Sequence, residues 1–456
     1  MRPLKTIFML LIVTVSVKAQ SDILNNYVQQ GIANNESLHQ QNFQLQKSMY
    51  ALKQATGLFF PIVSLEANYV DAKGGRTIDF PIGDIMNPVY QNLNQINSAL
   101  QSGAPRYPSL SNVSEQLNPS NFYDAYFKIA LPIVNAEIWY NRDIKKDQVK
   151  MQQNEVVIYE RELVKDIKVA YFNYLKAVRA ITIYENALRM VKESERVNQK
   201  LVDNGKEVVY VLSRSKSEVS KIEAQLNEVQ NTKKNAAAYF NFLINKPQDS
   251  EITIDEALLN NALALPDDLS LTSDRREELT KLLLASKINN SVLGLNKASW
   301  IPKIGASIDL GSQASDFKFN SSSKYYLLGV SFDWSLFSGL TDVYKVKQAK
   351  LEIDALDAQT RYAKSWLQLA ASSAANSYIS AKQNFASATD QENSASQYYG
   401  LMDKKYREGQ ALYIEYLDAR NESTLASLQK SITYFDAWIR HTELERANAG
   451  FNINQP

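Results

Sequence analysis

The sequence contains no cysteine and only two histidines, His39 and His441, among its 456 residues. The lack of cysteine excludes disulfides, thiolate metal sites, cysteine nucleophiles and lipid attachment through cysteine. Both histidines lie on polar stretches typical of a helix surface, so no metal site and no cofactor are expected. The formal net charge is only +1, which indicates no strong basic field and no nucleic-acid partner.

Signatures of catalysis are also missing. The sequence has no phosphate-binding loop, nucleophile elbow, metal-ligand spacing or isolated acid–base pair. Its many Asp and Glu residues follow helix surfaces near Lys or Arg, as solvated charges do. We therefore predict that the protein is not an enzyme and has no catalytic residue.

Proline is absent between Pro132 and Pro247, and after Asn135 this stretch holds a single glycine, Gly205. Proline breaks helices most strongly, and glycine is the next least favourable residue inside one. The stretch therefore predicts two long helices folded back on each other at Gly205. The first limb, residues 136–200, would be on the order of 100 Å long at 1.5 Å per residue.

The second half repeats this arrangement, with no proline between Pro302 and Pro456 and a second turn predicted at Gly409. Apolar residues recur every seven positions on the first long helix, which is a coiled-coil pattern. A long soluble coiled coil fits these helices equally well. The residues of this seam are Val149, Val156, Leu163, Ala170, Ala177, Tyr184 and Val191.

The first residues predict a secretory signal peptide over residues 1–19. Arg2 and Lys5 precede the apolar run Ile7–Val17, and a small residue, Ala19, stands at the expected cleavage site. The apolar run is shorter than the roughly 20 residues that cross a bilayer. The protein is thus expected to be exported without a transmembrane helix, either as a soluble periplasmic protein or as a β-barrel protein of the outer membrane.

Four segments alternate between apolar and polar residues and predict strands at 61–70, 121–132, 302–312 and 325–337. Residues 71–121, between the first two, are rich in Gly, Pro, Asn and Ser and predict a long loop with some local structure. Aromatic residues lie toward the strand ends, where the aromatic girdle of a membrane barrel would be. They are Tyr69, Tyr123, Tyr326 and Trp334.

The two halves are related as an internal duplication. Laying Pro61 on Pro302 matches Glu36 with Glu277 without a gap, and a separate alignment of Gly205 with Gly409 matches Lys216 with Arg420. The predicted first repeat, 20–270, contains a helix, strands 61–70 and 121–132, a hairpin turning at 205 and a linker. The predicted second repeat, 271–456, contains a helix, strands 302–312 and 325–337, a hairpin turning at 409 and a tail.

Four strands are too few for a transmembrane barrel, for which about eight is the smallest number. Open strand edges cannot cross lipid, so strands in a membrane would require several chains to share one barrel. The predicted fold is an α+β membrane protein with duplicated α-helical hairpins and four strands per chain. The alternative is a small sheet packed on the helices of a soluble protein.

The second turn reads Tyr406-Arg407-Glu408-Gly409, followed by Tyr413-Ile414-Glu415-Tyr416-Leu417-Asp418-Ala419. The strand-to-helix junctions are Leu131–Ala136 and Trp334–Gly339. With the signal peptide and the duplicated hairpins, these motifs make nearly the whole mature chain resemble the TolC family of outer-membrane efflux channels. The turn is similar to that family's Tyr-x-x-Gly … Asp-Val-Leu-Asp-Ala sequence.

The resemblance implies a homotrimer with one twelve-stranded barrel in outer-membrane lipid of a Gram-negative cell. The helices would project into the periplasm as an α-barrel. The implied function is that of the exit duct of a tripartite efflux or type I secretion system. The duct would be a passive conduit for small molecules or proteins exported by an inner-membrane pump. Its implied partners are a periplasmic adaptor protein and an inner-membrane pump of the RND or ABC type. The alternatives are a soluble periplasmic coiled-coil adaptor and a structural protein.

The resemblance also implies site residues at the helical tips. An acidic ring at the periplasmic entrance falls on Glu415 and Asp418, and three copies would place six carboxylates around a narrow mouth, which attracts cations. The alternative is that both are solvated turn residues. Polar residues that hold the family's mouth shut are replaced by Ala411 and Val211, so closure must use other polar contacts or packing. The expected tip and adaptor contacts are Gly205, Val208, Tyr210, Leu212, Tyr406, Gly409, Leu412, Tyr413 and Leu417.

Overall fold

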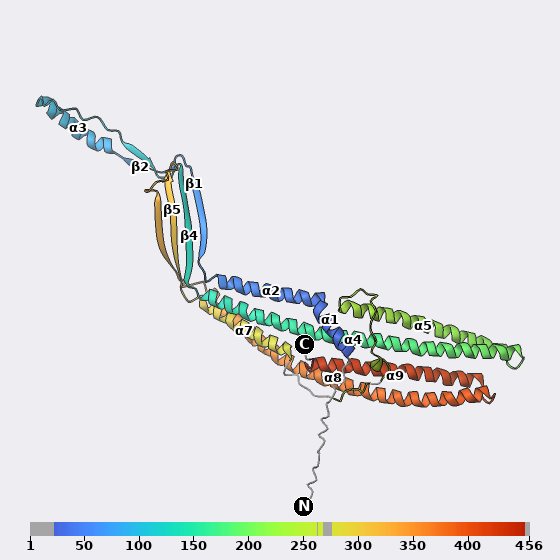
Figure 1. The fold of residues 1–456 in the computed structure, drawn as a ribbon. Coiled ribbons are helices and arrows are strands. Elements are labelled where there is room, and N and C mark those ends of the chain that lie inside the picture. Colours follow the sequence, from blue (N-terminus) through green and yellow to red (C-terminus); the bar gives the residue numbers. More distant parts are fainter. Residues whose placement is uncertain (1–21, 262, 268–275, 452–456) are drawn as a thin grey trace, which may run out of the picture. The chain divides into compact units, whose positions relative to one another are not determined.

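The computed structural model describes residues 22–261, 263–267 and 276–451, so the predicted signal peptide and the predicted repeat boundary lie outside the described residues. The chain forms two compact units. One contains Met1–Tyr50, Lys145–Asn290 and Lys350–Pro456, and the other contains Ala51–Ile144 and Ser291–Ala349. Helices α4 (Ala136–Asp203) and α8 (Thr341–Arg407), labelled in Figure 1, each begin in the second unit and continue into the first.

The second unit contains a four-stranded antiparallel sheet of order β1-β4-β5-β6. Its strands lie close to the four predicted ones, but β4 does not end at Pro132. It continues to Val134, and the register with β5 shifts between these residues because proline has no N–H to donate. The strand bounds are Ile62–Val70 (β1), Phe122–Val134 (β4), Lys303–Ser315 (β5) and Lys324–Asp333 (β6).

The segment predicted as a long loop is more ordered than expected. It contains the antiparallel pair β2 (Thr77–Phe80) and β3 (Val113–Gln116), and the 18-residue helix α3 (Ile82–Ala99), with Pro88 inside it. Helix propensity is low here because of Pro88 and several Asn residues. The side chains of two of those Asn residues supply hydrogen bonds that tie α3 to the extended segment following it.

The two predicted hairpins are confirmed. They are α4 with α5 and α8 with α9, and their turn glycines, Gly205 and Gly409, have φ of +62° and +72°, which side-chain-bearing residues rarely adopt. Both turns make the same pair of backbone bonds, as duplication predicts: Gln410 N–H, for example, donates to Lys405 O at 2.8 Å. The helix bounds are Asp22–Asn34 (α1), Glu36–Gly57 (α2), Ala136–Asp203 (α4), Val209–Leu243 (α5), Glu256–Leu259 (α6), Glu277–Ala298 (α7), Thr341–Arg407 (α8) and Tyr413–Ala447 (α9).

The first helical stretch, predicted as one helix, is broken at Asn35. The buried Asn35 side chain donates to Leu243 O at 2.9 Å and accepts from Leu38 N–H at 3.0 Å, which caps α2. The break lets α1 leave the direction of α2 and enter the helical unit's core.

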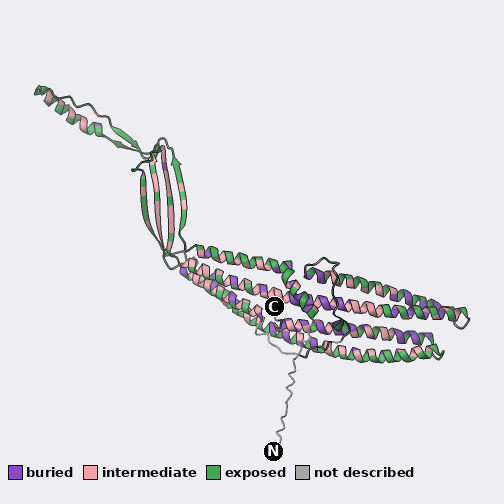
Figure 2. Cartoon of the chain, in the orientation of Figure 1, coloured by how far each residue is buried: buried purple, intermediate pink, exposed green. Residues whose placement is uncertain are grey.

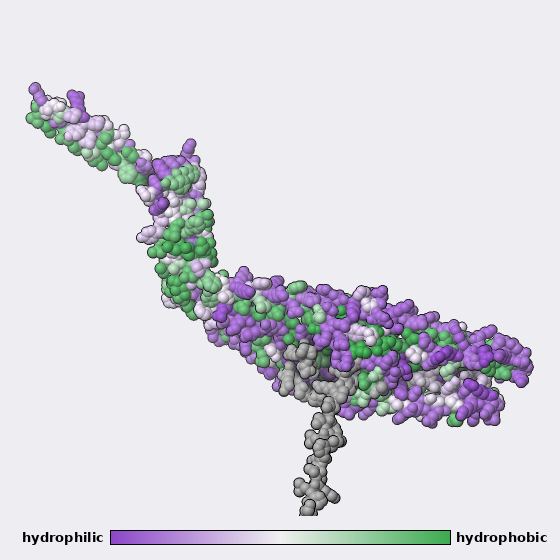
Figure 3. Space-filling model, in the orientation of Figure 1, coloured by the Kyte–Doolittle hydropathy of each residue, from purple (hydrophilic) through white to green (hydrophobic). Residues whose placement is uncertain are grey.

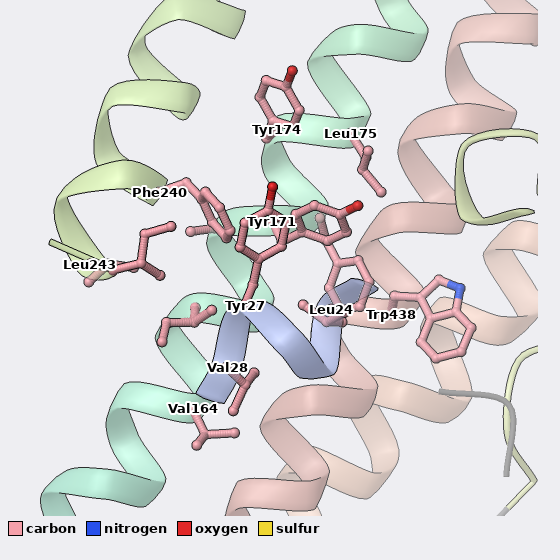
Figure 4. Close-up of a cluster of buried hydrophobic side chains, with 14 of the residues drawn as sticks. Leu24, Tyr27, Val28, Val164, Tyr171, Tyr174, Leu175, Phe240, Leu243 and Trp438 are labelled. Carbon is pink, nitrogen blue, oxygen red and sulfur yellow. The ribbon is translucent and has the colours of Figure 1, made fainter. Parts of the chain in front are cut away.

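That core surrounds α1 (Figure 4). The ring of Tyr27 packs edge-on against Phe240 of α5, with centroids 5.0 Å apart, and also contacts Tyr171 of α4. Gly31 allows the close approach, because a Cβ there would lie 2.2 Å from Ile167 Cδ1. Figure 2 shows buried residues concentrated along the long helices. Among the described residues, no helix combines the length and hydropathy needed to cross a membrane.

Candidate functional site

The sheet has one apolar and one polar face, and the strand register aligns both across all four strands. Leu65 lies opposite Phe127, Phe127 opposite Leu310, and Leu310 opposite Tyr326. These side chains remain exposed in the single chain, from 44% at Leu310 to 74% at Tyr326, and Figure 3 shows hydrophobic residues over this sheet. A continuous exposed apolar face of this kind requires a covering of lipid or protein.

The opposite face carries hydrogen-bonded polar and charged groups. Tyr126 donates to the Glu66 carboxylate at 2.5 Å, and Tyr325 donates to Asp124 at 2.9 Å. Lys128 lies opposite Asp309 in the register of β4 and β5. This face suits contact with water.

In the part of the sheet that the structure describes, β1 and β6 each pair with one neighbouring strand only. Their outer edges therefore present backbone N–H and C=O groups without a strand partner. Such edges cannot lie in lipid, where each unpaired group costs several kcal/mol.

Aromatic side chains gather where β1 ends and β4 begins. Phe317 stacks on Tyr69 and Tyr123, with centroid distances of 5.3 and 5.7 Å, and Phe319 also packs on Tyr123. At the other end of the sheet, Phe332 and Trp334 have centroids 6.4 Å apart. Both ends of the apolar face thus carry aromatic residues, as in a membrane-interface girdle.

The helical tips form a second site. An apolar cluster joins α5, α8 and α9, and its buried members include Val211 and Tyr416. Val211 thus contributes to packing at a position where the family resemblance implied a polar residue. The cluster consists of Val211, Tyr413, Tyr416 and Leu417, with Tyr399 and Tyr406 packed against it.

A polar chain joins one residue from each of the four long helices. Tyr406 of α8 donates to Asn198 Oδ1 of α4 at 2.6 Å, and Asn198 Nδ2 donates to Ser215 Oγ of α5 at 2.7 Å. Ser215 Oγ lies 2.9 Å from the hydroxyl of Tyr413 in α9. Burial, with the negative charge of Glu207, raises the pKa of Tyr406 to about 12, so its hydroxyl stays protonated and able to donate.

The same region of the tips contains a buried ion pair. Arg420 Nη2 of α9 contacts a Glu218 carboxylate oxygen of α5 at 3.1 Å, and the two side chains are 1% and 3% exposed. Arg214, which is largely exposed, contacts the other Glu218 oxygen at 3.1 Å. Within the described residues, Nε and Nη1 of Arg420 have no hydrogen-bond partner. The pair ties the two hairpins together, although its hydrogen bonding is incomplete.

Several of the residues expected to contact an adaptor lie in the turns or have exposed side chains at the helical tips. Gly205 and Gly409 form the turns, and the side chains of Val208, Tyr210 and Leu412 are exposed.

Three other residues expected to contact an adaptor are buried: Leu212, Tyr413 and Leu417. Leu417 and Tyr413 are enclosed by the aromatic cluster, and Tyr413 also contacts Ser215. Their burial contradicts a direct contact role in the single chain, and we assign them to packing.

The two candidate ring residues, Glu415 and Asp418, are exposed and one helical turn apart at the start of α9. Glu415 accepts a hydrogen bond from Leu412 N–H at 2.8 Å and so caps the helix. Asp418 has no such structural role among the described contacts. Ala411, the second departure from the family pattern, is half-buried beside this turn.

Sequence reasoning missed Asn198, Ser215, Glu218 and Arg420 as tip residues. Matching the two turn glycines places Arg420 on Lys216, but this did not reveal that Arg420 pairs with Glu218. The signal available was the presence of polar residues at seam positions of otherwise apolar helices.

The sheet and hairpins together give a fold similar to that of solved outer-membrane channels. Residues 269–433 match the family model described as outer membrane efflux protein. No curated protein sequence matches the chain.

Solved structures are similar over nearly the whole chain. The outer-membrane channel OprN is 17% identical, with a TM-score of 0.75 over 94% of this chain and 91% of its own. The CmeC channel of Campylobacter jejuni is 16% identical, with a TM-score of 0.75 over 95% and 87%. VceC of Vibrio cholerae is 15% identical, with a TM-score of 0.73 over 93% and 95%. These matches confirm the resemblance to outer-membrane efflux channels and the predicted fold.

Proposed function

We propose that three copies of this chain form the outer-membrane exit duct of a tripartite efflux or type I secretion system. The observation that carries this proposal is the sheet, which is apolar on one face, polar on the other and open at both edges. Three such sheets supply twelve strands, and closing them edge to edge leaves no unpaired backbone group in lipid. The exposed apolar face then contacts lipid of the outer membrane of a Gram-negative cell.

The polar face lines the lumen of this barrel. Its carboxylates are those of Glu66, Asp124, Asp309 and Asp333, and its ammonium groups are those of Lys128 and Lys303. A water-filled lumen allows passive passage of small molecules or proteins, with direction supplied by an inner-membrane pump of the RND or ABC type. No part of this function calls for catalysis or nucleic acid.

The helical hairpins extend into the periplasm, and their turns meet an adaptor protein. The exposed apolar side chains of Val208, Tyr210 and Leu412 supply contact area at both turns. Glu415 and Asp418 from three chains form an acidic ring that favours cations at the mouth. The polar chain from Tyr406 to Tyr413 and the buried pair of Arg420 hold the two hairpins together in the closed mouth.

Membrane fractionation and conductance test the proposal. The chain is expressed with its leader in a Gram-negative host, extracted from outer membranes and added to planar bilayers. The expected result is recovery only with detergent and discrete single-channel steps. Recovery in the periplasmic supernatant without detergent would favour a soluble adaptor or structural protein and reject the channel.

A matched pair of substitutions tests the orientation of the sheet. Val330→Lys places a charge on the lipid face and should cost about 2–4 kcal/mol if the site is near the bilayer midplane, with loss of assembled protein from outer membranes. Ser331→Lys, next along β6, points into the lumen and should leave assembly intact while changing ion selectivity. Equal assembly of both variants would contradict the assignment of the faces.

A further inference from the structure

Helix α3 and residues 105–112 form an arm held together by paired hydrogen bonds. Asn87 Nδ2 donates to Leu110 O at 2.9 Å, and Leu110 N–H donates back to Asn87 Oδ1 at 2.8 Å. Asn94 makes the same two bonds with Tyr107, both at 2.9 Å. The extended segment thus covers the side of α3 that carries Asn87 and Asn94, and it leaves the other sides of the helix uncovered.

A stripe of large apolar residues occupies a different side of α3. Its members are spaced by three or four positions, which places them on one helix face. Their exposed fractions run from 38% at Leu93 to 71% at Leu100, and Figure 3 shows hydrophobic residues along this arm. The stripe consists of Ile82, Ile85, Val89, Leu93 and Ile96 of α3 and of Leu100, the residue that follows the helix.

The charge of the arm helps to decide what covers this stripe, because the arm carries only one acidic residue, Asp84, and one basic residue, Arg106 of the extended segment. Asp84 is the one charged residue of α3, and it accepts a hydrogen bond from Asn112 at 2.9 Å. Helices that bind anionic lipid surfaces carry Lys or Arg on their polar face, and α3 has neither. By contrast, nearly neutral helices with matching apolar stripes can approach one another without charge repulsion.

We propose that the three α3 stripes of one trimer pack against one another as a three-helix bundle at the outer mouth of the channel. The inference rests on the proposed function, because only a trimer brings three copies of the arm to one end of one barrel. The arm connects β1 to β4, so chain order places it at the end of these strands opposite to α2 and α4. The bundle covers the apolar stripes and narrows the exit.

The absence of cysteine makes a direct test possible. Val89→Cys places one thiol on the stripe, and Gln91→Cys places one on an exposed position on the far side of the same helix. Each variant is purified as the full chain in detergent, its mass is measured by native mass spectrometry, and it is then treated with an oxidant or a short bis-maleimide. A disulfide requires Cα atoms within about 7 Å, and the bis-maleimide covers a slightly wider gap.

The expected result is covalent dimers from the Val89→Cys trimer and at least tenfold fewer from the Gln91→Cys trimer. Ile96→Cys repeats the test two turns further along the stripe. An intact trimer in which neither stripe thiol reacts with its copy would overturn the inference and leave lipid or another protein as the cover. Equal linking of Gln91→Cys would also overturn it. A monomeric mass would instead contradict the proposed function itself. The native mass spectrum shows this before any cross-linking is done, so the two outcomes can be distinguished.

Discussion

Removing the two partners of the buried ion pair should have unequal effects. In Glu218→Leu, Arg420 keeps as its one side-chain partner among the described residues the amide oxygen of Asn421, at 2.7 Å, and its side chain is 1% exposed. In Arg420→Leu, Glu218 keeps its contact with Arg214 at 3.1 Å, which reaches water. We therefore expect Glu218→Leu to destabilise the contact between the hairpins more than Arg420→Leu does.

The expected magnitudes follow from burial. Leaving a buried charge without its partner costs about 3–5 kcal/mol, which we assign to Glu218→Leu. Arg420→Leu leaves a carboxylate that is still paired, and a cost of about 1–3 kcal/mol is expected for its lost hydrogen bond. The double variant removes both charges and the unsatisfied Nε and Nη1 of Arg420, so its cost should be below about 1 kcal/mol.

Hydrogen–deuterium exchange of the trimer measures these costs locally. Peptides covering residues 198–222 and 399–421 report opening of the tips. Since about 1.4 kcal/mol corresponds to a tenfold change, Glu218→Leu should speed exchange there by roughly two to three and a half orders of magnitude, and the double variant by less than about tenfold. Exchange in the double variant equal to the product of the two single effects would show no coupling and would refute the reasoning.

Three further predictions concern the mouth and the helical unit. Glu415→Gln with Asp418→Asn should weaken cation block and cation preference in planar bilayers; unchanged selectivity would remove the acidic ring. Tyr406→Phe breaks the 2.6 Å bond to the α4 amide and should raise the open fraction of single channels, whereas the exposed control Tyr398→Phe should not. Burial raises the pKa of Glu278, but Arg276 and its other donors outweigh this and lower the pKa to about 2. Because the pKa of Glu278 is lower in the folded protein than in the unfolded chain, the ionised carboxylate stabilises the fold, by at most about 3 kcal/mol. This stabilisation is fully present above pH 4.5 and is lost as the pH falls toward 2. Thermal unfolding should therefore separate Glu278→Gln from wild type at pH 7 and not at pH 2.

Much of the fold could be predicted because it depends on local rules. The absence of proline after Pro132 predicted the first hairpin, and a positive φ at Gly205 and Gly409 is what the turns require. Strict alternation predicted the strands and the face on which Leu65 and Phe127 meet.

Other features depend on contacts between distant residues. The break at Asn35 requires Leu243, which lies 208 positions away, and α3 forms despite Pro88 because Asn87 and a second Asn bind the extended segment. No local pattern carries such information, so the sequence predicted one helix in the first case and a loop in the second.

At the helical tips, too, some residues could be predicted from the sequence and others could not. The resemblance of the turn motif located Glu415 and Asp418, and both are exposed. The polar chain draws one residue from each of four helices, including Asn198 and Ser215. Such residues can be found only when the four helices are placed together.

The central claim is that the edge strand β1 of one copy joins the edge strand β6 of the next, and cross-linking between these strands tests it most directly. A cysteine at Ser64 on β1 is combined, one at a time, with cysteines at Leu327, Gly329 and Ser331, which lie on the same face of β6. We expect one combination to link the purified protein into a covalent ring that stops at three chains on a denaturing gel. Monomers alone for every combination, or a ladder that continues beyond three chains, would contradict this claim.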